Sequence, residues 1–162
     1  MERIPELEAA VGKAVQQYPN CAQCSFVAMA EYLNLDVDVP DIARALTALP
    51  GIGTTGETCG AVTAALLGIG LALGPTDPKD KAANHATEMV GHKFAKTVEA
   101  ALGSTRCADL VESMTGTRYD LANPEDGQKY LAAGGMQKCV GSVVKTLTMA
   151  VATIKEAKAE AV

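Results

Sequence analysis

The residues most able to do chemistry in this chain are its five cysteines, Cys21, Cys24, Cys59, Cys107 and Cys139. A deprotonated cysteine is a ligand for soft metals and a nucleophile in thiol–disulfide exchange. The chain opens with the acidic stretch MERIPELE, which lacks the apolar core of a secretory signal, so we expect a cytoplasmic protein. Because structural disulfides are rare in that reducing compartment, the cysteines indicate a metal site or a redox function.

The spacing of the cysteines does not match the common local metal motifs. Cys21 and Cys24 form a CxxC pair, but no second pair follows, as a zinc finger or ribbon requires. No strand-like segment precedes this pair, as a thioredoxin-like active site requires. The remaining cysteines lie far apart in the sequence. A shared site would therefore take each ligand from a separate element of the fold.

The elements that must position these cysteines are predicted to be helices. Nearly every segment has the helical period of apolar residues, and the breaks between segments carry Gly, Pro or Asn. We expect an all-α fold, a single compact bundle of about six to eight helices forming one domain over residues 1–162. The expected helices cover residues 3–17, 21–34, 39–48, 58–73, 79–102, 105–114, 124–133 and 136–158.

Each cysteine lies in or beside the first turn of an expected helix. Asn20 is the expected N-cap of the helix that starts at Cys21, with Gln23 at the capping-box position, and Ser104 is the expected N-cap before Cys107. Free N–H groups at a helix N-terminus favour a thiolate over a thiol, and an anionic cluster of thiolates would gain from several such ends. Inert thiols that fill the core are the alternative reading of the same placement.

Two of the expected helices have distinctive apolar patterns. In the helix over 58–73, Gly60, Ala64 and Gly68 share one face, so we expect a central, buried helix that another backbone approaches closely. The glycine-rich segment 50–56 before it either brings backbone N–H groups near the sulfurs around Cys59 or forms a flexible turn. The last helix has one apolar stripe, made by Met136, Val140, Val143, Leu147, Ala150, Ile154 and Ala157.

Composition excludes several classes of function. The net charge is −5 and no basic stripe is present, so we expect no nucleic-acid partner. The longest apolar run, residues 61–73, is too short to cross a bilayer, so we expect no membrane association. No Ser-His-Asp order or carboxylate pair stands out. We therefore expect an electron-transfer or accessory protein rather than an independent enzyme.

The segments around the cysteines resemble a known family, the C-GCAxxG-C-C redox-active proteins, which are typical of anaerobic bacteria and archaea. The matching segments are Asn20-Cys-Ala-Gln23, then Gly56-Glu-Thr-Cys-Gly-Ala-Val-Thr63 followed by Leu-Gly-Ile-Gly-Leu, then Cys107-Ala-Asp-Leu110, and finally Cys139 with Val143. The resemblance covers roughly residues 15 to 150. The same module is similar to the iron–sulfur part of split-Soret cytochromes, but no CxxCH motif is present, so covalent c-type haem is excluded.

The resemblance implies an iron–sulfur cluster, 2Fe–2S rather than 4Fe–4S, in a homodimer that exchanges electrons with a partner oxidoreductase. By the same resemblance, Cys21, Cys59, Cys107 and Cys139 are the metal ligands. Around them, Gly56, Gly60 and Ala61 are expected to let the backbone approach, and Thr58 to donate a hydrogen bond to a sulfur.

One departure from the family concerns the segment Gly51-Ile-Gly53. If the family's Gly-Cys-Ala stretch aligns there, Ile52 stands where a cysteine is expected. Cys24 would then be a substitute ligand, or the cluster would be absent. Otherwise Cys24 is a neighbour of the cluster or the redox partner of Cys21.

Two other functions fit the same residues. The first is a thiol–disulfide redox protein that uses Cys21 and Cys24, with the pKa of Cys21 lowered at the helix N-terminus. The second is a non-catalytic interaction subunit, in which the small-residue helix packs against a partner and the thiols are structural.

Overall fold

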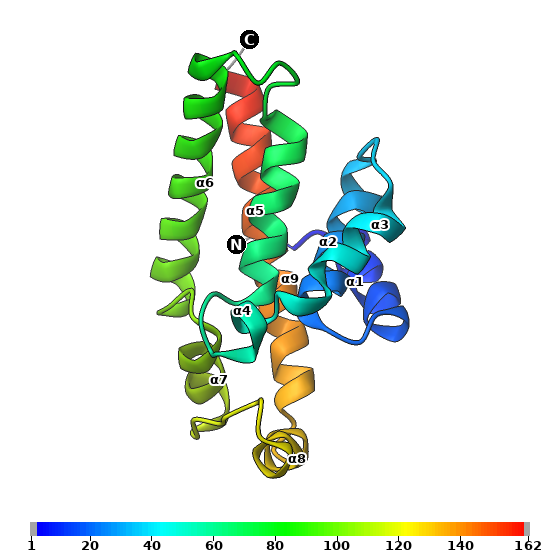
Figure 1. Cartoon of the computed structure of the whole chain (residues 1–162), viewed down its shortest axis with the longest axis vertical. Coiled ribbons are helices and arrows are strands. Elements are labelled where there is room, and N and C mark those ends of the chain that lie inside the picture. Colours follow the sequence, from blue (N-terminus) through cyan, green and yellow to red (C-terminus); the bar gives the residue numbers. More distant parts are fainter. Residues whose placement is uncertain (1–2, 161–162) are drawn as a thin grey trace.

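The computed structural model of the chain describes residues 3–160 and consists of helices and short connections (Figure 1). Eight α-helices of two or more turns are present within that range, together with the one-turn helices α4 and η1. The predicted all-α bundle is thus confirmed. The elements are α1 (Pro5–Gln17), α2 (Cys21–Leu33), α3 (Val39–Ala45), η1 (Leu46–Ala48), α4 (Gly51–Thr54), α5 (Gly60–Leu73), α6 (Lys81–Leu102), α7 (Cys107–Thr115), α8 (Pro124–Ala132) and α9 (Gly135–Glu160).

Helix α5 lies at the centre of the bundle, in contact with α2, α6 and α9 (Figure 1). The small-residue face predicted for it is buried at Gly60, Ala64 and Gly68. A Cβ atom at Gly68 would lie 2.7 Å from Sδ of Met29, so the absence of a side chain there lets α2 pack against α5. The last turns of α5 are less enclosed, since Leu71 is 40% exposed. The expected burial therefore holds through Ile69 and fails in the last turn, where Gly70 and Leu71 are exposed.

Helix α9 contributes a large part of the core, together with α1, α2, α5 and α6. Its predicted stripe is buried in the middle of the helix, at Val143, Leu147, Ala150 and Ile154. Met136 is 45% exposed, which corrects the prediction at the start of the helix. The first turns of α9 extend beyond the main core and border a cavity instead. The apolar pattern of the sequence therefore continues into turns that the core does not cover.

Helix α6 packs on α5 and α9 with a narrow apolar stripe, in which Phe94 and Val98 are buried. Its other faces are polar, and His85 and Glu88 on it are exposed. Across residues 3–160, none of the helices combines the length and apolar character that crossing a bilayer requires.

The glycine-rich segment before α5 has a defined backbone conformation. It forms the short turn α4, in which four successive residues have left-handed backbone angles: Gly51 (φ 56°), Ile52 (φ 51°), Gly53 (φ 68°) and Thr54 (φ 62°). Thr55 closes the turn, because its Oγ1 donates hydrogen bonds to the carbonyl oxygens of Gly51 (3.0 Å) and Ile52 (2.9 Å). The segment is a left-handed turn that lies against Cys107, since a Cβ atom at Gly51 would lie 3.6 Å from Cys107 Sγ. An approach of its N–H groups to the sulfurs around Cys59 stays a prediction.

Candidate redox site

Cys21 is fixed at the first residue of α2 by the predicted N-cap. Asn20 Oδ1 accepts a hydrogen bond from the backbone N–H of Gln23 at 3.0 Å, and Asn20 Nδ2 donates to Gln23 Oε1 at 2.9 Å. Gln23 in turn donates from Nε2 to the carbonyl oxygen of Ala43 at 3.0 Å. The start of α2 is thereby tied to α3, and the expected cap is confirmed.

Cys59 and Cys107 are brought together by a short backbone pairing that the sequence did not reveal. The N–H of Cys59 donates to the carbonyl oxygen of Thr105 at 2.9 Å, and the N–H of Cys107 donates to that of Glu57 at 2.6 Å. Thr58 and Arg106 form an isolated antiparallel bridge at the crossing point. Because only a few residues pair, no alternation in the sequence could have marked this contact.

The helix that begins at Cys107 lacks the predicted serine cap. Arg106 occupies the N-cap position of α7 and makes no capping hydrogen bond with its side chain. Ser104 lies two residues further back, where its Oγ accepts from the N–H of Arg106 at 3.0 Å and donates to Asp109 Oδ2 at 2.9 Å. The N–H groups at the start of α7 are instead satisfied by the 56–57 segment, so the cap comes from the tertiary fold.

A cavity of about 400 Å³ lies at the end of the bundle where these helices begin. Three of the predicted ligands line it, Cys21, Cys107 and Cys139, and its walls are mostly apolar. Cys59 lies beside this group, because Gly60, the next residue, is in contact with Cys21: a Cβ atom at Gly60 would lie 2.6 Å from Cys21 Sγ. The structure therefore places all four predicted ligands around one end of the bundle.

Cys139 meets an aromatic side chain that sequence reasoning missed. Tyr130, near the end of α8, donates from its hydroxyl to Cys139 Sγ at 3.0 Å and lines the same cavity. A signal was present in the sequence, since Tyr130 stands nine positions before Cys139 across the Gly134-Gly135 pair. The two side chains meet, however, only because the chain reverses direction at that glycine pair.

Cys24 points away from the large cavity. It is 4% exposed, and its Sγ contacts the carbonyl oxygen of Cys21 at 3.6 Å. It lines a smaller neighbouring cavity of about 190 Å³, which Cys21 and Cys139 also border. Ile52, the position at which the family's pattern could place a cysteine, is 42% exposed and lines neither cavity.

Hydrogen bonding and burial give the thiols different pKa values. The pKa of Cys59 is lowered to about 7, first by the neighbouring Cys21 thiol and then by the N–H groups of Ala61 and Val62 at the start of α5. The neighbouring Cys59 thiol and burial raise the pKa of Cys21, which is opposite to the predicted lowering at this residue. Burial also raises the pKa of Cys24 to about 11. The helix N-terminus thus favours a thiolate at Cys59 instead.

The small residues around the cysteines allow close packing, as predicted. A Cβ atom at Gly60 would lie 2.6 Å from Cys21 Sγ, and one at Gly56 would lie 3.0 Å from Cβ of Ala108. Ala61 is fully buried. Thr58 takes part in the bridge to Arg106, and its hydrogen bond to a sulfur stays a prediction.

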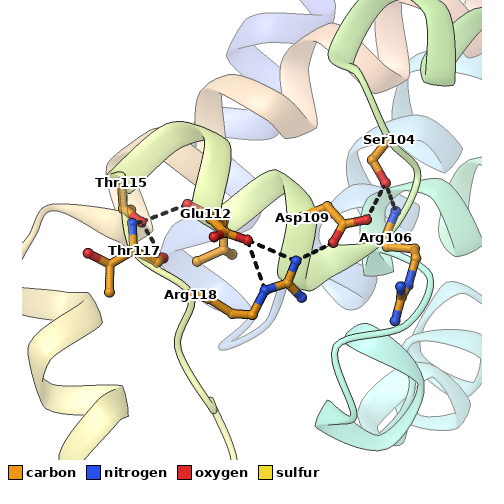
Figure 2. Close-up of polar contacts among 8 residues, drawn as sticks. Ser104, Arg106, Asp109, Glu112, Thr115, Thr117 and Arg118 are labelled. Atoms are coloured by element: carbon orange, nitrogen blue, oxygen red, sulfur yellow. Dashed lines mark hydrogen bonds and ion pairs between the residues drawn. The ribbon is translucent and has the colours of Figure 1, made fainter.

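One wall of the large cavity is a connecting segment, residues 116–123 between α7 and α8, held by an arginine (Figure 2). Arg118 donates from Nη2 to Asp109 Oδ1 at 2.6 Å and from Nε to Glu112 Oε2 at 2.8 Å. The hydrogen bond from Arg118 holds the pKa of Asp109 below its ordinary value. Both carboxylates belong to α7, so the segment is fastened to the helix that begins at Cys107.

The predicted ligands around the cavity are thiols, a donor set that is chemically suited to an iron–sulfur cluster. Within residues 3–160, no three His, Cys, Asp or Glu side chains stand close enough together to hold one ion. The cysteines are distributed around a cavity instead, and the predicted ligands are all thiols. Thiolates are the ligands that iron–sulfur clusters use.

Comparison with known proteins identifies the family. The family model described as "Putative redox-active protein (C_GCAxxG_C_C)" matches residues 19–153, a range that includes all five cysteines. No curated protein and no solved structure shows significant similarity to the chain. The resemblance expected from the cysteine segments is confirmed, and since the match covers most of its length, the chain belongs to the C_GCAxxG_C_C redox-active protein family.

Proposed function

We propose that the chain binds a 2Fe–2S cluster through Cys21, Cys59, Cys107 and Cys139 and transfers electrons to or from a partner oxidoreductase. The observation that carries this proposal is that four thiols, distant in the sequence, meet at one end of the bundle around an apolar cavity. Membership of a redox-active family supports the same conclusion.

The residues around the cavity can stabilise negative charge on the ligand sulfurs. A bound cluster of this kind takes up and releases one electron. The N–H groups of Ala61 and Val62 stabilise negative charge on Cys59, and Tyr130 stabilises it on Cys139. The proposed homodimer rests on the resemblance alone.

The proposal is tested by anaerobic reconstitution with iron and sulfide, followed by a visible spectrum and metal analysis. We expect about two irons and two sulfides per chain, as a 2Fe–2S cluster requires. Cys59→Ser and Cys107→Ser should lose the visible absorption, while Cys24→Ser is the matched control and should keep it. Unchanged helical circular dichroism shows that each variant is folded. Colourless wild-type protein with negligible iron would contradict the proposal.

Thiol–disulfide exchange is the second candidate, and one observation favours it. Cys21 lies against the residue that follows Cys59, and Cys59 is the thiol with the lowered pKa. In this function the Cys59 thiolate attacks a partner disulfide, the mixed disulfide is resolved by Cys21, and both electrons pass to the released dithiol. The Cys21–Cys24 pair stays an alternative for the same chemistry.

Disulfide mapping separates these candidates. Iron-free protein is oxidised with glutathione disulfide and its peptides are analysed by mass spectrometry. A Cys21–Cys59 disulfide in protein that holds no iron supports thiol exchange through that pair, and a Cys21–Cys24 disulfide supports the CxxC pair. Protein that forms neither a cluster nor a disulfide would match an interaction subunit with structural thiols.

A further inference from the structure

We propose that Tyr130 is a positioning residue of the redox site: its hydroxyl donates a hydrogen bond to Cys139 Sγ and raises the reduction potential of the group that Cys139 binds. This inference rests on the proposed function and concerns a residue outside the cysteine motif. It is carried by one contact, the distance of 3.0 Å from Tyr130 Oη to Cys139 Sγ.

The hydroxyl of Tyr130 has no competing partner in the part of the chain that the structure describes. Its only hydrogen bond there is the one to Cys139. Tyr130 is a buried residue, with 8% of its surface exposed. A buried hydroxyl without a partner loses stability, and the bond to sulfur is therefore the favoured arrangement of this side chain.

The ring of Tyr130 is held in place from two sides. Gly134 (φ 69°) turns the chain sharply between α8 and α9, and Gly135 then lies directly against the ring, where any Cβ atom would overlap it. On another side, Tyr119 packs edge-on, with ring centroids 6.0 Å apart. Tyr119 belongs to the 116–123 segment, which Arg118 fastens to α7 (Figure 2).

The physical effect follows from charge. Reduction of an iron–sulfur group adds an electron whose charge spreads onto the ligand sulfurs, and an O–H dipole directed at one sulfur stabilises the reduced form more than the oxidised form. The apolar walls of the cavity reduce screening and strengthen this effect. Removing the hydroxyl should therefore lower the potential while leaving the ligands in place.

The first test is redox titration of the reconstituted full-length protein, followed by visible absorption. We expect Tyr130→Phe to keep the iron content of the wild type and to shift the midpoint potential to a lower value. Tyr119→Phe is the matched control, because it removes a hydroxyl from the ring beside Tyr130 and leaves the bond to Cys139 intact. A merely structural role for Tyr130 would change iron retention or thermal stability without moving the potential of the loaded protein.

The second test needs no iron and examines the hydrogen bond itself. The ultraviolet resonance Raman doublet of tyrosine responds to hydrogen bonding of the hydroxyl. In metal-free, reduced protein, Cys139→Ala should change this doublet, and the same substitution in a Tyr130→Phe background should not.

The outcomes of the two tests distinguish the inference from the proposed function. A loaded Tyr130→Phe protein with the potential of the wild type overturns the inference and leaves the proposed function standing. A wild type that cannot be loaded overturns the proposed function and the potential effect with it. An unchanged tyrosine doublet in Cys139→Ala overturns the hydrogen bond, whatever the iron content.

Discussion

At the scale of single residues, identical thiols acquire different chemistry from their surroundings. The neighbouring Cys21 thiol and the backbone N–H groups at the start of α5 lower the pKa of Cys59 to about 7. At Cys24, three residues along the same helix from Cys21, burial outweighs the hydrogen bonds from Ser25 and raises the pKa to about 11. The sequence identified both residues as cysteines near helix starts, but the partners that separate them come from distant segments.

The raised pKa of Cys24 predicts how stability depends on pH. The folded state keeps this proton up to about pH 11, whereas the unfolded chain releases it near pH 9.0. Its contribution to folding is therefore fully present below pH 9 and is lost as pH rises toward 11, by roughly 3 kcal/mol in the unfolding free energy. Urea unfolding of reduced, metal-free protein between pH 8 and 11 measures this, with Cys24→Ala as control. The difference between the two proteins should shrink over that range, and a constant difference would contradict the prediction.

At the scale of elements, the site depends on how closely helix starts approach one another. Gly60 begins α5 directly against Cys21, and a side chain there would meet both Cys21 Sγ at 2.6 Å and the backbone nitrogen of Ala22 at 2.9 Å. The small-residue face of α5 could be seen in the sequence, and so could the cap at Asn20. The sequence could not show which helix would approach that face, because the period of a helix marks its buried side and not its neighbour.

Gly60→Ala should therefore separate the starts of α2 and α5. Overpacking of this kind costs about 1–3 kcal/mol of unfolding free energy. Gly141→Ala is the matched control, since nothing lies within 4 Å of a Cβ atom at that position in α9, and it should stabilise the protein by up to about 1 kcal/mol through helix propensity. Urea unfolding gives both values, and equal effects of the two substitutions would contradict this account of the packing.

At the scale of the whole molecule, the redox site lies at one end of the bundle, away from most of the core. That core is built from α1, α2, α5, α6 and the middle of α9, while the cavity is bounded by helix starts and by the 116–123 segment. This segment is fastened to α7 by half-exposed ion pairs rather than by buried apolar contacts (Figure 2). Access to the cavity should therefore change more readily than the fold itself.

Arg118→Gln should loosen this segment and leave global stability nearly unchanged. Exposed ion pairs contribute at most about 1 kcal/mol, so the urea midpoint should move little. Amide hydrogen exchange over residues 117–123 should become faster, while the core of α9 keeps its protection. Arg44→Gln, which removes the exposed pair with Asp41, serves as control and should leave exchange in this segment unaltered. Unchanged exchange in Arg118→Gln would show that the ion pairs do not hold the segment.

The amino-acid sequence was enough to predict the helical class, the approximate bounds of the long helices, the cap at Asn20 and the family of the cysteine motif. These features depend on the period of apolar residues and on contacts within a few positions, which a sequence records directly. The tertiary structure decided that Cys59 lies beside Cys21 and that Ser104 does not cap α7. It also placed Tyr130 on Cys139 and gave the 50–56 segment a left-handed turn beside Cys107. Each of these depends on which distant backbone lies alongside, and that is fixed only when the helices pack.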